Sequence, residues 1–149
     1  SKVMPYLFLD IDGVLLPTGE VFEGRFPEAQ SEVLRGILNL SDCWEIILST
    51  TWRHFHSENE IAGFLRASGM EPVKIDGQIG HEEPGSRWVA ILEYCTKFHL
   101  PLGEIDILDD LPMGHLSDRQ VFCDEFQGLL PEHVSQVNEI LRRSPDLER

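Results

Sequence analysis

Short apolar runs and longer amphipathic stretches alternate along the chain. The apolar runs lie at residues 6–9, 44–48, 104–108 and 120–123, and a weaker run lies at 73–75. Their near-continuous hydrophobic character is typical of strands that are buried on both faces of a parallel sheet. The pattern therefore predicts a sheet built from short strands.

The stretches between these runs carry apolar residues at helical spacing. A first helix is predicted from Pro27 and a last one from Pro131, because proline is well tolerated in the first turn. Ser57 and Glu60 have the spacing of a capping box and predict a second helix, and a third is predicted from about Ser86. Strands that alternate with helices indicate an α/β fold, a Rossmann-like three-layer sandwich around a central, mostly parallel five-stranded sheet.

All 149 residues are expected to form a single domain. Residues 14–26 contain a Pro-Thr-Gly-Glu turn between two small apolar groups, which predicts a short flap hairpin over the end of the first strand. The tail from about residue 143 is polar and is expected to be frayed.

Composition narrows the range of partners. The formal net charge is −14, from 12 basic and 26 acidic side chains, and such a charge disfavours nonspecific binding to nucleic acid. No apolar run reaches the roughly 18 residues that a membrane span needs, so no membrane partner is expected. The cysteines Cys43, Cys95 and Cys123 are far apart and lack metal-site spacing, which favours reduced thiols and a cytoplasmic location.

Two acids, Asp10 and Asp12, directly follow the first apolar run. Burial of a carboxylate costs several kcal/mol unless a cation or an ion pair compensates for it. We therefore expect these acids to lie just beyond the carboxyl edge of the sheet, where open α/β sheets bind ligands, or to hold a cation, or both. A solvated turn after the strand is the alternative interpretation.

Polar side chains also follow two other strands. Ser49 and Thr50 end the second run, and Asp109 and Asp110 end the run at 104–108. In a parallel sheet these ends point the same way, so the carboxylates would suit a hard cation such as Mg²⁺ and the hydroxyls would suit phosphate oxygens. Arg87, in the first turn of the third helix, is placed to neutralise phosphoryl charge. The alternatives are capping or turn chemistry for the strand-end residues and an ordinary surface role for the arginine.

The motifs at these three strand ends resemble those of the haloacid dehalogenase-like (HAD) hydrolases. They are Leu-Phe-Leu-Asp10-Ile-Asp12-Gly13-Val14, similar to the first motif of that superfamily, Ile-Ile-Leu-Ser49-Thr50, similar to the second, and Ile-Leu-Asp109-Asp110, similar to the fourth. They occur in the order of the superfamily and span most of the chain. The chain also looks like a small branch in which a second motif like Ser49 to Arg53 and a late Gly-Leu step, here Gly128-Leu129, recur.

The resemblance implies a Mg²⁺-dependent phosphatase. Asp10 would attack phosphorus, form an aspartyl-phosphate and ligate Mg²⁺. Asp12 would protonate the leaving group and then activate water, while its backbone carbonyl ligates the metal. Asp110 is the preferred further ligand, with a supporting role for Asp109.

The resemblance also implies a phosphate-binding set. Ser49, with the backbone of Thr50, would hold the phosphoryl oxygens. The superfamily carries a lysine or arginine in its third motif, for which Arg87 is the best-placed residue and Lys74 is the competitor.

Members of this superfamily often insert a cap domain into the flap or after the third strand. Here the corresponding gaps, residues 14–26 and about 76–85, are too short to hold one, so the resemblance implies a capless protein. An open site suits a bulky substrate, or a small one that another subunit encloses, and the oligomeric state is left open. Trp52 and Arg53 are candidate substrate contacts, with packing in the core as an equal alternative for Trp52.

We therefore hypothesise a phosphomonoester hydrolase that acts through Asp10 on a phosphorylated substrate of unassigned identity. One alternative is an end-processing phosphatase for nucleic acid, which the open site permits and the net charge does not favour. A basic groove beside the nucleophile would support it, built from Arg25, Arg53, Lys74 and Arg87. The other alternative is a non-catalytic phosphate- or partner-binding module that keeps the fold, although both acids of the first motif are intact.

Overall fold

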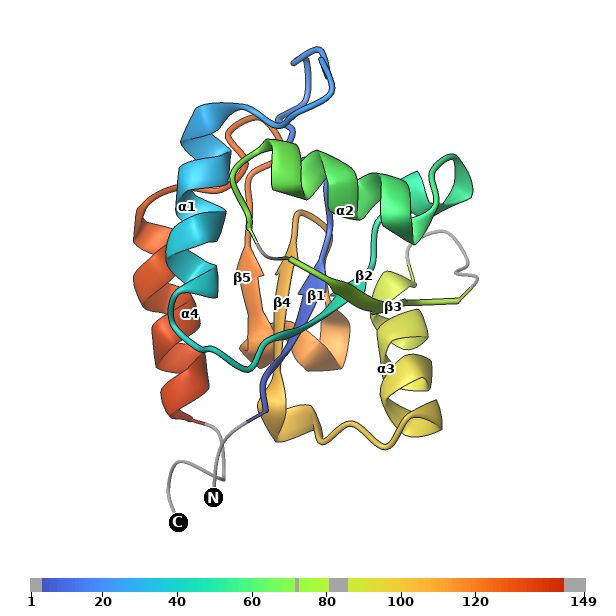
Figure 1. Ribbon diagram of the computed structural model, residues 1–149. Helices are drawn as coiled ribbons and strands as arrows, with labels where there is room; N and C mark the ends of the chain where they lie inside the picture. Colours follow the sequence, from blue (N-terminus) through green and yellow to red (C-terminus); the bar gives the residue numbers. More distant parts are fainter. Residues whose placement is uncertain (1–3, 72, 81–85, 144–149) are drawn as a thin grey trace.

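A five-stranded, all-parallel sheet lies at the centre of the molecule (Figure 1). The computed structural model describes residues 4–71, 73–80 and 86–143. The strand order is β3-β2-β1-β4-β5, with β1 (Tyr6–Leu9), β2 (Glu45–Leu48), β3 (Ile75–Gln78), β4 (Ile105–Asp109) and β5 (Gln120–Phe122). The predicted α/β fold with a five-stranded sheet is confirmed, and the sheet is parallel throughout.

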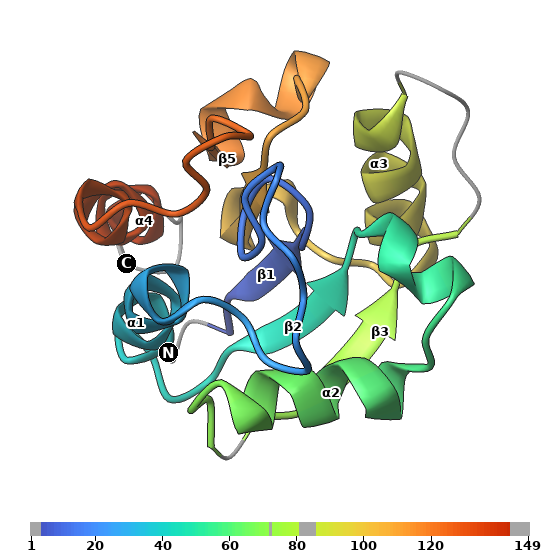
Figure 2. The same ribbon diagram turned by 90° about the horizontal axis from the view of Figure 1, so that it is seen from above.

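Helices cover both faces of the sheet and make three layers, as Figure 2 shows from above. The helices are α1 (Glu28–Leu38), α2 (Glu58–Ala67), α3 (Arg87–Lys97) and α4 (Glu132–Arg142). Leu7 and Leu9 of β1 pack in one core with residues of α1, α2 and α4, whereas Phe8 points to the other face and packs with residues of α3. Within the described ranges, no helix combines the length and the hydrophobicity that a membrane-spanning segment needs.

Local signals fix both ends of α2. The hydroxyl of Ser57 accepts a hydrogen bond from the Glu60 N–H (3.1 Å), and the Glu60 carboxylate accepts one from the Ser57 N–H (3.0 Å), so the predicted capping box is confirmed. Gly69 has a φ of 90°, and the following Met70 N–H donates to the Leu65 carbonyl (3.0 Å). The capping box fixes the start of α2 directly after the segment between β2 and α2, which contributes to the site.

The third strand lies further along the chain than the apolar pattern predicts. It begins at Ile75 instead of residue 73. The Ile46 N–H of β2 donates to the Asp76 side chain (2.9 Å) instead of a strand carbonyl, and the register shifts just beyond this point. Because the Asp76 side chain takes the place of a backbone acceptor, β3 pairs with β2 only from Ile75 onward. Lys74 therefore precedes β3, at the amino edge of the sheet.

Residues 13–26 form a flap over the end of β1 (Figure 2), but not the predicted hairpin. The only strand pairing that this segment makes is an isolated bridge between Asp12 and Leu16. The Ile11 carbonyl accepts from the N–H groups of residues 14–16, at 2.9 to 3.1 Å, which folds the chain into a tight turn. The side chains of residues 14–16 are all buried, whereas a hairpin would bury alternate ones.

The described ranges contain no cap domain, in agreement with the prediction. The flap is a single loop, and residues 76–80 belong mostly to β3. Residues 81–85 of the second gap and residues 144–149 of the tail lie outside the described residues.

The strand register brings three strand ends to one level. Leu9 at the end of β1 lies opposite both Leu48 of β2 and Leu108 of β4. The Asp10 N–H donates to the Leu108 carbonyl (3.1 Å), and the Ser49 N–H donates to the Leu9 carbonyl (3.0 Å). The chain leaves β1 for β2 on one side while β4 lies on the other, so the β1–β4 boundary is a topological switch point, where α/β sheets bind ligands.

Candidate active site

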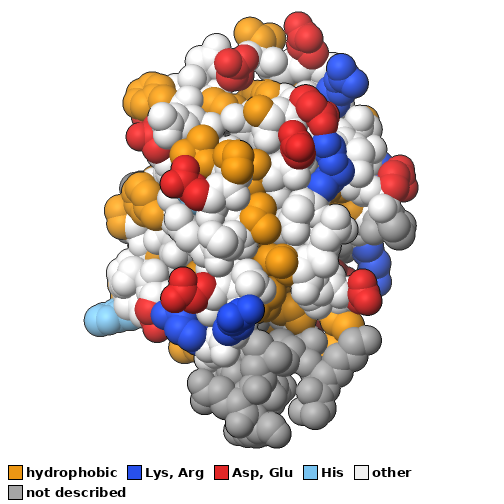
Figure 3. All heavy atoms as spheres, turned by 90° about the vertical axis from the view of Figure 1, so that its left-hand side faces the viewer, with side chains coloured by type: hydrophobic (Ala, Val, Ile, Leu, Met, Phe, Trp, Pro, Cys, Tyr) orange, Lys and Arg blue, Asp and Glu red, His pale blue; other side chains and the backbone are white. Residues whose placement is uncertain are grey.

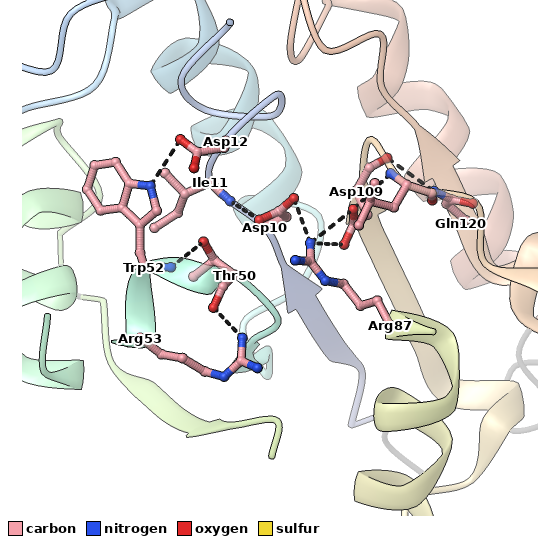
Figure 4. Close-up of polar contacts among 10 residues, drawn as sticks. Asp10, Ile11, Asp12, Thr50, Trp52, Arg53, Arg87, Asp109 and Gln120 are labelled. Atoms are coloured by element: carbon pink, nitrogen blue, oxygen red, sulfur yellow. Dashed lines mark hydrogen bonds and ion pairs between the residues drawn. The ribbon is translucent and has the colours of Figure 1, made fainter. Parts of the chain in front are cut away.

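Asp10 follows β1 directly and is only 3% exposed. Its Oδ1 accepts a hydrogen bond from the Ile11 N–H (2.8 Å), and its Oδ2 lies 2.9 Å from Nη1 of Arg87. The same Nη1 lies 3.2 Å from Oδ2 of Asp109, which is fully buried at the end of β4 and also accepts from the Leu111 N–H (3.0 Å). One guanidinium nitrogen thus faces two buried carboxylates from neighbouring strands (Figure 4).

Asp110 completes a cluster of three carboxylates. One oxygen from each of Asp10, Asp109 and Asp110 lies within 4.8 Å of the others. Gly13 makes room for Asp110, because a Cβ at this position would lie 2.4 Å from Asp110 Oδ2. Gly13 also has a φ of 78°, a conformation that residues with a side chain rarely adopt. The glycine of the first motif is therefore required by space as well as by backbone conformation.

Burial raises the pKa of two acids of this cluster, Asp10 and Asp109. Burial, followed by the charge of Asp109, raises the pKa of Asp10 well above its usual value, although Arg87 opposes this. Burial also raises the pKa of Asp109 to about 6, against the opposing charge of Arg87. Three carboxylates and one guanidinium meet here, so the ionised cluster has an excess of negative charge that an added cation would relieve.

The structure separates the two candidates for the third-motif cation. Arg87 is the first residue of α3, is 5% exposed and points into the carboxylate cluster. Lys74 has a largely exposed side chain and lies 3.7 Å from Asp76 at the opposite edge of the sheet. Position therefore favours Arg87, and its contact with phosphate stays a prediction.

Ser49 and Thr50 are buried after β2 but differ in their contacts. The Thr50 hydroxyl accepts a hydrogen bond from the Trp52 N–H (3.1 Å) and caps the short 3-10 helix Thr51–His54. The Ser49 hydroxyl is fully buried and has no hydrogen-bond partner among the described residues. The capping alternative thus applies to Thr50 and not to Ser49, whose hydroxyl suits a ligand oxygen.

Asp12 is exposed, and its carboxylate lies on the Trp52 side of the site and not against Asp10 (Figure 4). The indole Nε1–H of Trp52 donates to Oδ1 of Asp12 at 3.0 Å. Asp12 is the predicted acid/base and Trp52 is a predicted substrate contact, and this hydrogen bond links the two side chains. Trp52 also packs against the core, so its packing alternative is correct in part.

Arg53 ties the loop after β2 to the end of β3. Its guanidinium donates to the backbone carbonyls of Thr50 and Gly80, the latter at 2.9 Å. Arg53 binds backbone carbonyls, Arg87 is buried and Lys74 lies at the opposite edge, so these three of the four side chains do not line one exposed groove. Over the face of α1 and α4, Figure 3 shows acidic and basic side chains interspersed.

A comparison with protein families agrees with this geometry. The model for the HAD domain in Swiss Army Knife RNA repair proteins matches residues 6–134, which hold all three strand-end motifs. The chain belongs to this HAD family. The resemblance to HAD hydrolases is thereby confirmed, and a search among curated proteins returned no match.

The donor set of this HAD domain fits Mg²⁺, the ion that the superfamily typically uses. Carboxylate oxygens are the ligands that Mg²⁺ prefers, and they converge here from β1 and β4 with negative charge in excess. Asp109 is engaged by Arg87, whereas Asp110 is half-buried beside Gly13. This arrangement agrees with Asp110 as the direct ligand, which stays a prediction, as does ligation by the Asp12 carbonyl.

Two features of the HAD domain were not predicted from its sequence. The first is the space that Gly13 leaves for Asp110. The one sequence feature that could have indicated it is the glycine directly after Asp12 in the first motif. The hydrogen bond from Trp52 to Asp12 spans 40 positions, and no pattern of apolar residues encodes it.

Proposed function

We propose that the chain is a phosphomonoester hydrolase that works through an aspartyl-phosphate on Asp10. One juxtaposition carries the proposal. The buried Asp10 carboxylate, at the switch point of the sheet, clusters with two further acids and contacts a guanidinium that also contacts one of them. The buried Ser49 hydroxyl, which lacks a partner among the described residues, follows the neighbouring strand β2. A phosphoryl group would accept from that hydroxyl and from Arg87, while its phosphorus meets the Asp10 carboxylate.

The two acids of the first motif would divide the chemistry. In the first half-reaction an Asp10 oxygen bonds to phosphorus, the ester P–O bond breaks, and Asp12 donates its proton to the leaving oxygen. In the second, Asp12 takes a proton from water, the water oxygen bonds to phosphorus, and the bond to Asp10 breaks, which releases inorganic phosphate. The burial of Asp10 and the exposure of Asp12 support this division, because only the exposed acid can exchange protons with solvent.

The surrounding groups would hold the phosphoryl oxygens. The Ser49 hydroxyl and the Thr50 backbone would donate hydrogen bonds to them, and Arg87 would offset their charge. Mg²⁺ held by Asp10 and Asp110 would supply the remaining positive charge and favour the ionised form of Asp10.

Phosphate release from p-nitrophenyl phosphate, with and without MgCl₂, tests this proposal. We expect Mg²⁺-dependent turnover that falls about 10³-fold or more in Asp10→Asn. Asp106→Asn is the matched control, because Asp106 is an equally buried aspartate near the other end of β4. Turnover without metal, or turnover that survives in Asp10→Asn, would contradict the mechanism.

A phosphorylated end of RNA is the second candidate substrate. The description of the matching family model, which names RNA repair proteins, favours it, and the short flap leaves Asp12 exposed to a large substrate. The test compares kcat/KM for an oligoribonucleotide with a terminal phosphate and for the corresponding mononucleotide. We expect a preference of about tenfold or more for the oligonucleotide, and equal values would exclude recognition of RNA.

A further inference from the structure

We propose that Trp52 is a positioning residue that holds Asp12 in the orientation required for proton transfer to the leaving group. The inference rests on the proposed function, because it concerns the acid/base of that reaction. Its basis is the 3.0 Å hydrogen bond from the indole Nε1–H to Asp12 Oδ1 (Figure 4).

Asp12 needs an external anchor. It is exposed and follows the strand end, so water surrounds much of its carboxylate, and its χ angles are not fixed by packing. General acid catalysis requires the proton within hydrogen-bond reach of the leaving oxygen. A donor that fixes one carboxylate oxygen removes the rotational freedom that would otherwise oppose this placement.

The indole itself is held on several sides. Its ring and the ring of Phe22 in the flap pack in a T-shaped arrangement, with centroids 4.9 Å apart and an interplanar angle of 86°. The centroids of Phe26 and Phe64 lie 5.7 Å and 6.3 Å from that of the indole. The Trp52 backbone N–H is bound by the Thr50 hydroxyl (3.1 Å). Rings from the flap and from α2 therefore position the N–H from which Asp12 accepts a hydrogen bond.

The hydrogen bond also distinguishes the two oxygens of Asp12. Oδ1 accepts the indole N–H, so in the proposed reaction Oδ2 would be the oxygen that delivers the proton. As the bond between Asp10 and phosphorus forms and the ester P–O bond breaks, this proton passes from Oδ2 to the leaving oxygen. Trp52 takes no part in the bond changes.

Ordinary packing is the competing explanation for Trp52, and leaving-group dependence separates the two. A poor leaving group such as phenoxide needs a proton as it departs, whereas 2,4-dinitrophenolate does not. The ratio kcat/KM includes steps only up to departure of the leaving group, so it reports the half-reaction in which Asp12 acts as an acid.

Trp52→Phe keeps a ring and deletes the N–H. With Mg²⁺ present, we expect kcat/KM to fall about tenfold for phenyl phosphate and less than about threefold for 2,4-dinitrophenyl phosphate. In an Asp12→Ala background the same substitution should have no further effect on either substrate, since residues that act through one another are not additive. Equal losses on both substrates, or full additivity with Asp12→Ala, would show that Trp52 only packs.

Trp44→Phe is the matched control. The Trp44 Nε1–H also donates a hydrogen bond, to the Ile37 carbonyl at 3.2 Å, but Trp44 precedes β2 at the other edge of the sheet. Its loss should leave the ratio of the two kcat/KM values unchanged.

A flap variant gives a second route if Trp52→Phe does not fold. Phe22→Leu removes the ring that packs in a T-shaped arrangement with the indole and should give the same selective loss, at about threefold on phenyl phosphate. An unselective loss in this variant would overturn the proposal. A wild-type protein without Mg²⁺-dependent turnover would instead refute the proposed function, so the two failures are distinct.

Discussion

Nη1 of Arg87 lies 2.9 Å from Oδ2 of Asp10, and both side chains are almost completely buried. The ion pair joins the start of α3 to the end of β1 and supplies positive charge to a carboxylate that burial favours in its protonated form. Arg87 contacts Asp109 as well, so it offsets the charge of two acids at once. The candidate site therefore depends on one cation for its structure and, in the proposed reaction, for its chemistry.

Arg87→Gln should weaken both properties. We expect a loss of about 3–5 kcal/mol in the free energy of unfolding without Mg²⁺, because two buried carboxylates lose their counter-charge. We also expect a fall of about 10²-fold or more in Mg²⁺-dependent kcat. Urea unfolding and phosphate release measure these effects. Lys74→Gln, at the exposed competitor, should change stability by less than about 0.5 kcal/mol, and equal activity in the two variants would contradict the role of Arg87.

Gly13→Ala should displace Asp110. The new Cβ would lie 2.4 Å from Asp110 Oδ2, so the carboxylate must move, and the positive φ adds strain of about 1–3 kcal/mol. Gly19→Ala is the control. Gly19 has a φ of 96°, so an alanine there has the same backbone strain, but no atom lies within 4 Å of its Cβ and no side chain is displaced. We expect the rise in Tm on addition of MgCl₂ to shrink in Gly13→Ala and to persist in Gly19→Ala. The same rise in both variants would argue against a metal site at Asp110.

Ser49→Ala should separate activity from stability. The Ser49 hydroxyl is buried without a partner among the residues that the structure describes, so its removal should leave the free energy of unfolding unchanged or raise it by about 1 kcal/mol. Activity should fall about 10- to 100-fold, because the phosphoryl group loses a donor. Thr50→Ala should instead lower the free energy of unfolding by about 1 kcal/mol, because the Thr50 hydroxyl no longer caps the 3-10 helix. A Ser49→Ala variant that is destabilised and fully active would contradict this assignment.

Asp106 should make the protein less stable as pH rises. Burial raises its pKa to about 7, and within the described part of the chain neither carboxylate oxygen has a hydrogen-bond partner. An aspartate in the unfolded chain ionises near pH 4, so the folded state binds the proton more tightly. The contribution of Asp106 to stability is therefore full below about pH 4 and is lost as pH rises through about 7.

Asp106→Asn removes this dependence. Relative to the wild type, the variant should gain up to about 4 kcal/mol in the free energy of unfolding at pH 8 and little at pH 4, measured by urea unfolding. The exposed Asp118→Asn is the control and should show no such difference. A gain of the same size at both pH values would contradict the assignment to ionisation of Asp106.

The sequence predicted the parts of the site that depend on strand ends. Asp10, Ser49 and Asp109 follow apolar runs, and the level register of β1, β2 and β4 brings them together as expected from a parallel sheet. Arg87 lies in the first turn of α3, as predicted, while its contact with phosphate stays a prediction.

Features that depend on tertiary contact were not predicted. The turn in the flap is closed by three N–H groups on the Ile11 carbonyl, so its Pro-Thr-Gly-Glu segment never pairs as a hairpin. The start of β3 depends on the Asp76 side chain, which replaces a strand carbonyl. The orientation of Asp12 depends on the ring of Trp52, and a rotamer set by a distant side chain leaves no periodic signal in the sequence.

A trapped phosphoenzyme tests the central claim most directly. In Asp12→Asn, 2,4-dinitrophenyl phosphate should still phosphorylate the protein, because its leaving group needs no proton, while hydrolysis lacks its base. The measurement is acid quenching after mixing with this substrate and MgCl₂, followed by mass spectrometry of the peptides. We predict one phosphoryl group, on Asp10, that accumulates in Asp12→Asn and is absent from Asp10→Asn. A phosphoryl group on another residue, or release of 2,4-dinitrophenolate by Asp12→Asn without phosphorylated Asp10, would contradict the account.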